Sequence, residues 1–268
     1  MDLMKSFKFN MLQLLNKFQG QDGVKIIPDA LKRDLWVWKK CISDSRQGFP
    51  IRDFVDEPPI FPTTIISDAA GAALEWIEGK SVNKTIANDR GVASILHHGG
   101  KALKTATISW PGNLLMGQKS INGSYFGTKS GTLEAVGLIL PFDSYPTDLI
   151  GKKIVLQVDN TSLIYGWEKH YCKNDAETSL LLRVLHVIEV YLPCKIHLQH
   201  VKRCSTTMAK VVDQLSRKSS TTSKTLRIIK NSEKFEPKGA LYNWLKKPVL
   251  DWTLPEKIVS DISKILQK

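Results

Sequence analysis

The stretch TTIISDAAG, residues 63–71, constrains the fold most, because it places a carboxylate within an otherwise uncharged run typical of a buried strand. Burying an unpaired charge costs free energy. Asp68 therefore either ends the strand in a turn or faces a cation that neutralises it. The residues that follow, Ala69, Ala70 and Gly71, have almost no side chain and would leave room for a backbone or substrate to approach closely.

The segments after this stretch predict an antiparallel meander followed by alternating strands and helices. Strands are expected at 63–67, 91–96, 102–109, 152–159 and 195–201, and helices at 129–140, 178–192 and 205–218. The strand 152–159 is apolar almost throughout, as expected for a central strand covered on both faces. This order predicts an α/β fold with a mixed five-stranded sheet and helices on both faces. In the helix 178–192, the three-residue spacing of Arg183, His186 and Glu189 predicts a polar face.

Helical segments flank this predicted core on both sides. Helices near residues 2–18 and after Pro28, followed by a proline-rich connector, make up residues 1–62. Residues 219–230 are rich in Ser, Thr and Lys and indicate a basic linker, which a small helical appendage follows. The chain is therefore divided into a helical region (1–62), an α/β domain (63–218) and a basic linker with a small helical appendage (219–268).

The charge of the chain favours an anionic partner. The formal net charge is +12, and residues 202–268 hold 15 Lys and Arg against 6 Asp and Glu, so +9 of the excess lies in the last quarter. Nucleic acid is the first partner that such an asymmetry indicates. A basic protein kept soluble by its lysines is the alternative that charge alone leaves open.

Cysteine spacing and hydropathy indicate where the protein works. The four cysteines include no CxxC pair and no histidine at zinc spacing, which favours reduced thiols and no structural zinc. No apolar run approaches the ~20 residues needed to cross a bilayer. We therefore expect an intracellular protein, cytoplasmic or nuclear, that does not insert into a membrane.

Four acidic residues occupy special positions in the predicted order of elements: Asp68, Glu134, Asp159 and Asp213. The strand that ends in Asp159 should lie beside the strand that carries Asp68, because a helical crossover returns the chain into the sheet. Carboxylates that close repel each other, and a divalent cation between them removes the repulsion. Ligands that are all oxygen favour Mg²⁺ or Mn²⁺ over zinc. Taken singly, each residue also fits a turn, a helix-dipole contact or a solvated face.

Five motifs resemble the ribonuclease H domain of a retroelement reverse transcriptase. They are IISDAAG, SGTLEAVGLIL, IVLQVDNTSLI, and IHLQHV followed by VVDQLSR. The preceding DALKRDLWVWKKCI, with its proline-rich connector, is similar to part of the connection region in DIRS-like and pararetroviral polymerases. The resemblance covers about residues 25–218. It implies a ribonuclease H-like fold and a metal-dependent endonuclease that hydrolyses the RNA strand of RNA–DNA hybrids.

The resemblance also implies roles for single residues. The four carboxylates would hold two Mg²⁺ ions, with Mn²⁺ as a substitute; Asp68 would contact both, Glu134 and Asp159 would complete one site, and Asp213 the other. Ser130, Asn160 and Thr161 are candidates for contacts to 2′-hydroxyl groups of the RNA, although turn formation and capping explain them slightly better. A reverse transcriptase polymerase domain, in cis or in trans, is the expected protein partner.

Two other functions remain open on the sequence. One is a non-catalytic nucleic-acid-binding or scaffold domain that retains the fold, and the other is a different metal nuclease or a strand transferase. His200, beside the predicted site, either assists proton transfer or is structural. The tryptophans either stack on bases or pack in the cores of amphipathic helices: Trp36, Trp38, Trp244 and Trp252.

Overall fold

The computed structural model divides the chain into two compact units, residues 1–57 and 58–268. In the first unit it describes residues 32, 35, 36, 39 and 43, all helical and within the second predicted N-terminal helix. In the second it describes residues 63–71, 90–111, 130–170, 172, 175–192, 194–237, 239–247 and 253–266. The helix near 2–18, the connector at 46–62, the polar segment between the first two strands (residues 72–89), Trp38 and Trp252 lie outside the described residues.

A mixed six-stranded sheet with the order β5-β4-β1-β2-β3-β6 forms the centre of the second unit. Its strands are β1 (Thr63–Ala69), β2 (Gly91–His98), β3 (Lys101–Ser109), β4 (Lys153–Val158), β5 (Lys195–His200) and β6 (Glu233–Phe235). The first three are antiparallel, whereas β4 runs parallel to both β1 and β5. The sequence predicted the first five strands and their mixed character, but the prediction of five strands was wrong by one, because β6 joins parallel to β3.

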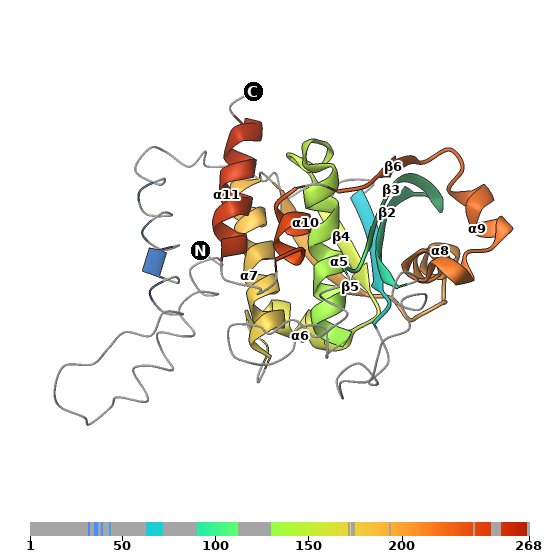
Figure 1. The fold of residues 1–268 in the computed structure, drawn as a ribbon, viewed down its shortest axis with the longest axis horizontal. Helices are drawn as coiled ribbons and strands as arrows, with labels where there is room; N and C mark the ends of the chain where they lie inside the picture. The colour runs from blue at the N-terminus through green and yellow to red at the C-terminus, as the bar shows by residue number, and fades with distance from the viewer. Residues whose placement is uncertain are drawn as a thin grey trace. The chain divides into compact units, whose positions relative to one another are not determined.

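Helices cover both faces of this sheet, as predicted (Figure 1). On one side lie α5 (Ser130–Ser144), α6 (Thr161–Lys169), α7 (Ala176–Tyr191), α10 (Ala240–Leu245) and α11 (Thr253–Leu266). On the other lie α8 (Thr207–Ser216) and α9 (Ser223–Ile228). Short 3-10 turns, η2 (Pro146–Leu149) and η3 (Lys218–Ser220), complete the described elements.

The C-terminal residues are part of this unit, which differs from the predicted linker and appendage. Residues 219–230 form the end of η3 and all of α9, in which Thr225 is buried, and β6 then extends the sheet. Lys104 Nζ of β3 lies 3.0 Å from Glu233 Oε2, an ion pair that joins β6 to β3. The same Nζ atom lies 2.7 Å from Asp148 Oδ2. Trp244 of α10 is 1% exposed, so for this residue core packing is confirmed over base stacking.

Helix α7 lacks the polar face that its sequence pattern predicted. Arg183 and His186 are each only 2% exposed, because α7 is packed against α5, α6 and α11. The His186 ring stacks on Trp167 of α6 with centroids 3.8 Å apart, and its Nε2 lies 3.1 Å from His170 Nδ1. Glu189 accepts a 2.9 Å hydrogen bond from the Ile196 amide and so joins the helix to β5. The three-residue period therefore marks polar contacts inside the fold and no solvated surface.

Helix α5 approaches the sheet closely at Gly137. A Cβ at this position would lie 3.1 Å from Val92 Cγ2 and 3.2 Å from Ser67 Cβ, tighter than ordinary van der Waals contact. We expect Gly137→Val to lower the free energy of unfolding by about 1–3 kcal/mol, because a branched side chain here forces α5 away from β1 and β2. Urea denaturation followed by circular dichroism measures this change.

A second glycine in the same helix is the matched control. A Cβ on Gly131 would have its nearest neighbour at 3.7 Å, so there is space for it. We expect Gly131→Ala to change the unfolding free energy by less than about 1 kcal/mol, in the stabilising direction. Equal destabilisation by both substitutions would contradict the packing argument at Gly137.

None of the helices that the structure describes is both long enough and apolar enough to cross a bilayer.

Candidate active site

Asp68 lies near the end of β1, with its carboxylate on the face of the sheet that α8 covers. The residue is 8% exposed and accepts a 3.1 Å hydrogen bond from the Ser216 hydroxyl of α8. Burial and the charges of Asp159 and Asp213 raise its pKa, while the Ser216 hydrogen bond and Arg217 act in the opposite direction. The carboxylate in the strand is therefore tolerated by partners from the last helix of the predicted domain, and no turn is needed to expose it.

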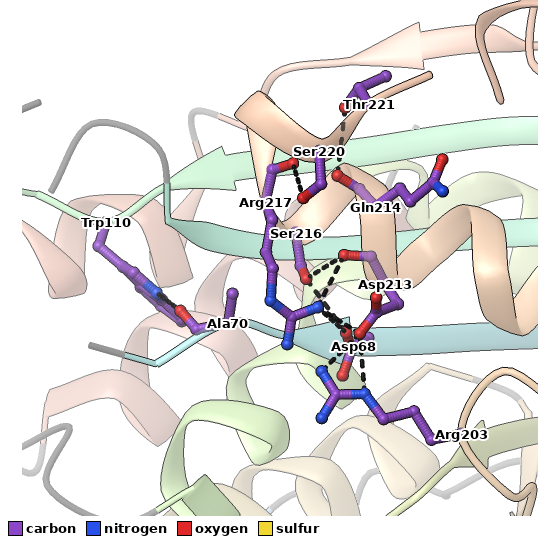
Figure 2. Close-up of polar contacts among 10 residues, drawn as sticks. All are labelled: Asp68, Ala70, Trp110, Arg203, Asp213, Gln214, Ser216, Arg217, Ser220 and Thr221. Atoms are coloured by element: carbon purple, nitrogen blue, oxygen red, sulfur yellow. Dashed lines mark hydrogen bonds and ion pairs between the residues drawn. The ribbon is translucent and has the colours of Figure 1, made fainter. Parts of the chain in front are cut away.

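The small residues after Asp68 make room for protein groups. The Ala70 amide donates to the Gly91 carbonyl at 2.9 Å, and the Ala70 carbonyl accepts from the Trp110 indole at 2.8 Å (Figure 2). A Cβ on Gly71 would lie 2.9 Å from the Leu133 side chain of α5. The expected close approach is thus made by a strand, an indole and a helix.

Asp159 and Glu134 form the second part of the site. The parallel pairing of β1 with β4 matches Ile66 with Gln157, so Asp68 lies two residues further along β1 and Asp159 lies directly after the last residue of β4. This confirms the predicted adjacency of the two strands. Glu134 of α5 is 9% exposed, and burial together with the charges of Asp159 and Asp68 raises its pKa to about 8.

Asp213 completes the predicted set, but its carboxylate is held by two arginines. Arg203 Nε donates to Oδ1 at 2.9 Å and Arg203 Nη2 at 2.5 Å, and Arg217 Nη1 donates to the same oxygen (Figure 2). Arg217 Nη1 also lies 3.9 Å from Asp68 Oδ2. Although partial burial acts to raise the pKa of Asp213, the hydrogen bonds and charges of the two arginines hold it below its ordinary value.

A pocket brings these groups together at the end of the central strands. Asp68, Asp159 and Asp213 line it, and so does Arg203. Glu134 is not one of the lining residues, but it lies close enough for the charges of Asp68 and Asp159 to raise its pKa. Four carboxylates from β1, α5, the end of β4 and α8 therefore meet in one region, and two guanidinium groups partly neutralise one end of it.

The predicted substrate-binding residues lie at the starts of α5 and α6. Asn160 caps α6, because its Oδ1 accepts a 2.9 Å hydrogen bond from the Ser162 amide, and its side chain also hydrogen-bonds Glu134. Ser130 and Thr161 are exposed at the first positions of their helices. His200 is exposed at the end of β5 and is not a core residue.

The donor set of the site fits a hard divalent cation. All four candidate ligands are carboxylates, and Glu134 Oε2 is buried without a hydrogen-bond partner among the described residues. In this arrangement, however, no three acidic, histidine or cysteine side chains of the described segments are placed to hold one ion. The arginine contacts of Asp213 direct its carboxylate to cations of the chain itself. Binding through Asp213 would require those contacts to be given up.

Sequence reasoning missed Ser216, Arg203 and Arg217. Asp213 and Arg217 are four residues apart in a predicted helix, which is the spacing of an ion pair, so the pattern in VVDQLSR contained this signal. Arg203 lies in the segment between β5 and α8, where no periodicity relates it to Asp213. Its contact follows only from the way α8 packs on the sheet.

Comparison with known proteins adds no assignment to this geometry. The chain matches no family model. A search of curated proteins likewise found no match. Any function must therefore be argued from the carboxylates, the arginines and the fold that positions them.

Proposed function

We propose that this chain is a metal-dependent ribonuclease H that hydrolyses the RNA strand of RNA–DNA hybrids, as part of a retroelement reverse transcriptase. One observation carries the proposal: Asp68, Glu134, Asp159 and Asp213 converge from β1, α5, the end of β4 and α8. The motifs that contain them are those that resemble the ribonuclease H family. The mixed sheet with helices on both faces supports a ribonuclease H-like fold.

The electrostatics of the site support metal-assisted hydrolysis. Two Mg²⁺ ions held by these carboxylates would supply an activated water and a stabilised leaving oxygen. The protein holds these acidic groups close together although burial and mutual repulsion disfavour their charged forms. The raised pKa values of Asp68 and Glu134 reflect this. The buried side chains of Asp68 and Glu134 would fix the positions of their oxygens relative to the substrate phosphate.

A basic segment next to the carboxylates supports a nucleic-acid substrate. Residues 202–235, which include α8, α9 and β6, contain nine Lys and Arg against Asp213 and Glu233. Lys202, Arg203 and Lys210 are exposed on this segment. Exposed cations beside the site would attract the phosphate backbone of a hybrid without regard to its sequence.

A non-catalytic nucleic-acid-binding domain is the second candidate, and the ion pairs of Asp213 favour it. A carboxylate already neutralised by Arg203 and Arg217 is stable without any metal. A domain that had lost catalysis would need no further cation at this end of the site. The two candidates differ in whether a divalent cation changes what the protein does.

Incubation with a labelled RNA–DNA hybrid tests the proposal directly. We expect cleavage of the RNA strand with Mg²⁺ or Mn²⁺ and poor cleavage with Ca²⁺, because Ca²⁺ accepts loose, variable coordination whereas in-line attack needs fixed geometry. Duplex DNA and single-stranded RNA are the substrate controls. Hybrid binding without cleavage in any metal would favour the binding domain, and cleavage that survives EDTA would contradict metal dependence.

A further inference from the structure

Arg217 lies at the point where two of the four carboxylates meet. Its Nη1 donates to Asp213 Oδ1 and, at 3.2 Å, to the Asp213 backbone carbonyl, and it lies 3.9 Å from Asp68 Oδ2. Only 22% of its side chain is exposed. The guanidinium group therefore contacts both the Asp68 and the Asp213 carboxylate, at the position where a cation shared by the two would lie (Figure 2).

Arg203 contacts the same carboxylate in a different setting. It donates to Asp213 alone among the acidic residues, and 52% of its side chain is exposed to solvent. Solvent screens an exposed ion pair, so such a pair contributes little. Of the two arginines, Arg217 is thus the more buried and the one with an ion-pair contact to both carboxylates, whereas Arg203 acts on Asp68 only through its charge.

We propose that Arg217 is a built-in counter-ion at the Asp68–Asp213 end of the site, which a divalent cation must displace before Asp213 can bind it. This inference rests on the proposed function, because it takes the carboxylates as metal ligands. It assigns to Arg217 a positioning role: the residue holds the Asp213 carboxylate in an ion pair until metal is present.

The physical basis is competition between two cations for the same oxygens. Asp213 Oδ1 accepts from both arginines, so a metal ion that uses this oxygen must break those contacts. A guanidinium that stayed in place would repel the ion at short range. Both effects lower the affinity for metal at this end of the site, while the Glu134–Asp159 end has no arginine contact of this kind among the described residues.

Calorimetric titration of the metal-free protein with Mn²⁺ tests the proposal. We expect Arg217→Gln to lower the Mn²⁺ dissociation constant of the weaker of the two metal sites, the one at the Asp68–Asp213 end, by about tenfold or more. The reason is that the substitution removes one nearby positive charge that is only partly screened. Arg217→Lys should fall between the two, because a single ammonium group on a shorter stem reaches both carboxylates less well. Arg227→Gln, which removes an exposed arginine of α9, should leave the affinity unchanged.

The Asp213→Asn background shows whether the gain acts through this carboxylate. There, Arg217→Gln should no longer tighten Mn²⁺ binding, because the oxygen that it frees is no longer a charged ligand. Circular dichroism establishes that each variant is folded; if Arg217→Gln is not, Arg217→Lys carries the test. An unchanged Mn²⁺ affinity in folded Arg217→Gln overturns the proposal, even where the wild-type protein cleaves hybrids. Absence of Mn²⁺ binding in every variant overturns both this proposal and the proposed function.

Discussion

Replacing Asp159 with asparagine is expected to reduce hybrid cleavage by orders of magnitude while hybrid binding persists. The substitution keeps the size and shape of the side chain but removes a full negative charge from beside Asp68 and Glu134. A metal site that loses a charged ligand can no longer hold its ions in the geometry that hydrolysis needs. Binding should be equal or tighter, because a carboxylate near the scissile phosphate repels it when metal is absent.

Folding provides a second readout for the same substitution. Crowded carboxylates destabilise the metal-free protein, so Asp159→Asn should raise its melting temperature slightly. The stabilisation by Mg²⁺ should shrink, since a ligand that binds only the native state stabilises it in proportion to its affinity. Glu168→Gln removes one carboxylate from the exposed surface of α6 and should alter none of these quantities. Wild-type protein that neither cleaves nor gains stability with Mg²⁺, yet binds hybrid as well as Asp159→Asn does, would identify a binding domain.

The central sheet could be predicted because its strands are long and their pattern is local. Strands β1 to β5 and helices α5, α7 and α8 are indicated by apolar runs, spacing or capping residues that the chain displays within each segment. The adjacency of β1 and β4 followed from the rule that a crossover returns the chain into the sheet. That rule sufficed to bring Asp68 and Asp159 together before any coordinates were known.

Short and context-dependent elements could not be predicted in this way. Strand β6 has three residues, EKF, and only its pairing with β3 and the contacts of Lys104 make it a strand. Helix α9 lies in a Ser/Thr/Lys-rich run, and its turn is held by the Thr222 cap of the Thr225 amide. Composition alone does not separate such a run from a linker, because the information lies in which surface it covers.

The arginines show the same limit within the site. The acidic residues could be singled out because burying a charge is costly and therefore needs a reason. Arg217 and Arg203 carry charges that are ordinary on a surface; only the four-residue spacing from Asp213 marks Arg217, and nothing in its own segment marks Arg203. The packing of α8 on β1 brings Arg217, already paired with Asp213 along the helix, to Asp68, and Arg203 reaches Asp213 from the segment before α8.

The metal-free protein is expected to lose stability as the pH rises from about 5 to 8, and Glu134→Gln should remove much of this loss. The pKa of Glu134 is about 8 in the folded protein, against an ordinary value of 4.5. Between these values the folded state keeps a proton that the unfolded state has released, so raising the pH favours unfolding. Above pH 8 the loss is complete, and below 4.5 it is absent.

The contribution of Glu134 to this pH dependence can be separated from that of the other buried acid, Asp143. Asp143, with a pKa raised to about 6 mainly by burial, contributes in the same direction at lower pH, so the interval from pH 6 to 8 isolates Glu134 best. There the unfolding free energy of the wild type should fall by an amount of the order of 2 kcal/mol more than that of Glu134→Gln. Urea denaturation in EDTA at each pH gives this difference, in which titrating groups away from the site cancel.

Adding Mn²⁺ should reverse which of the two proteins, wild type or Glu134→Gln, has the larger free energy of unfolding. In EDTA at pH 8, Glu134→Gln is expected to be the more stable, because its amide mimics the protonated acid without the cost of ionisation. With saturating Mn²⁺ the wild type should gain stability that the variant does not, because the ionised Glu134 carboxylate, with its buried Oε2, then has a cation to face. If the unfolding free energies of the two proteins in EDTA changed in parallel with pH, folding would not disfavour the ionised form of Glu134. The buried carboxylate would then be a structural group, and the case for a metal site at this end would fail.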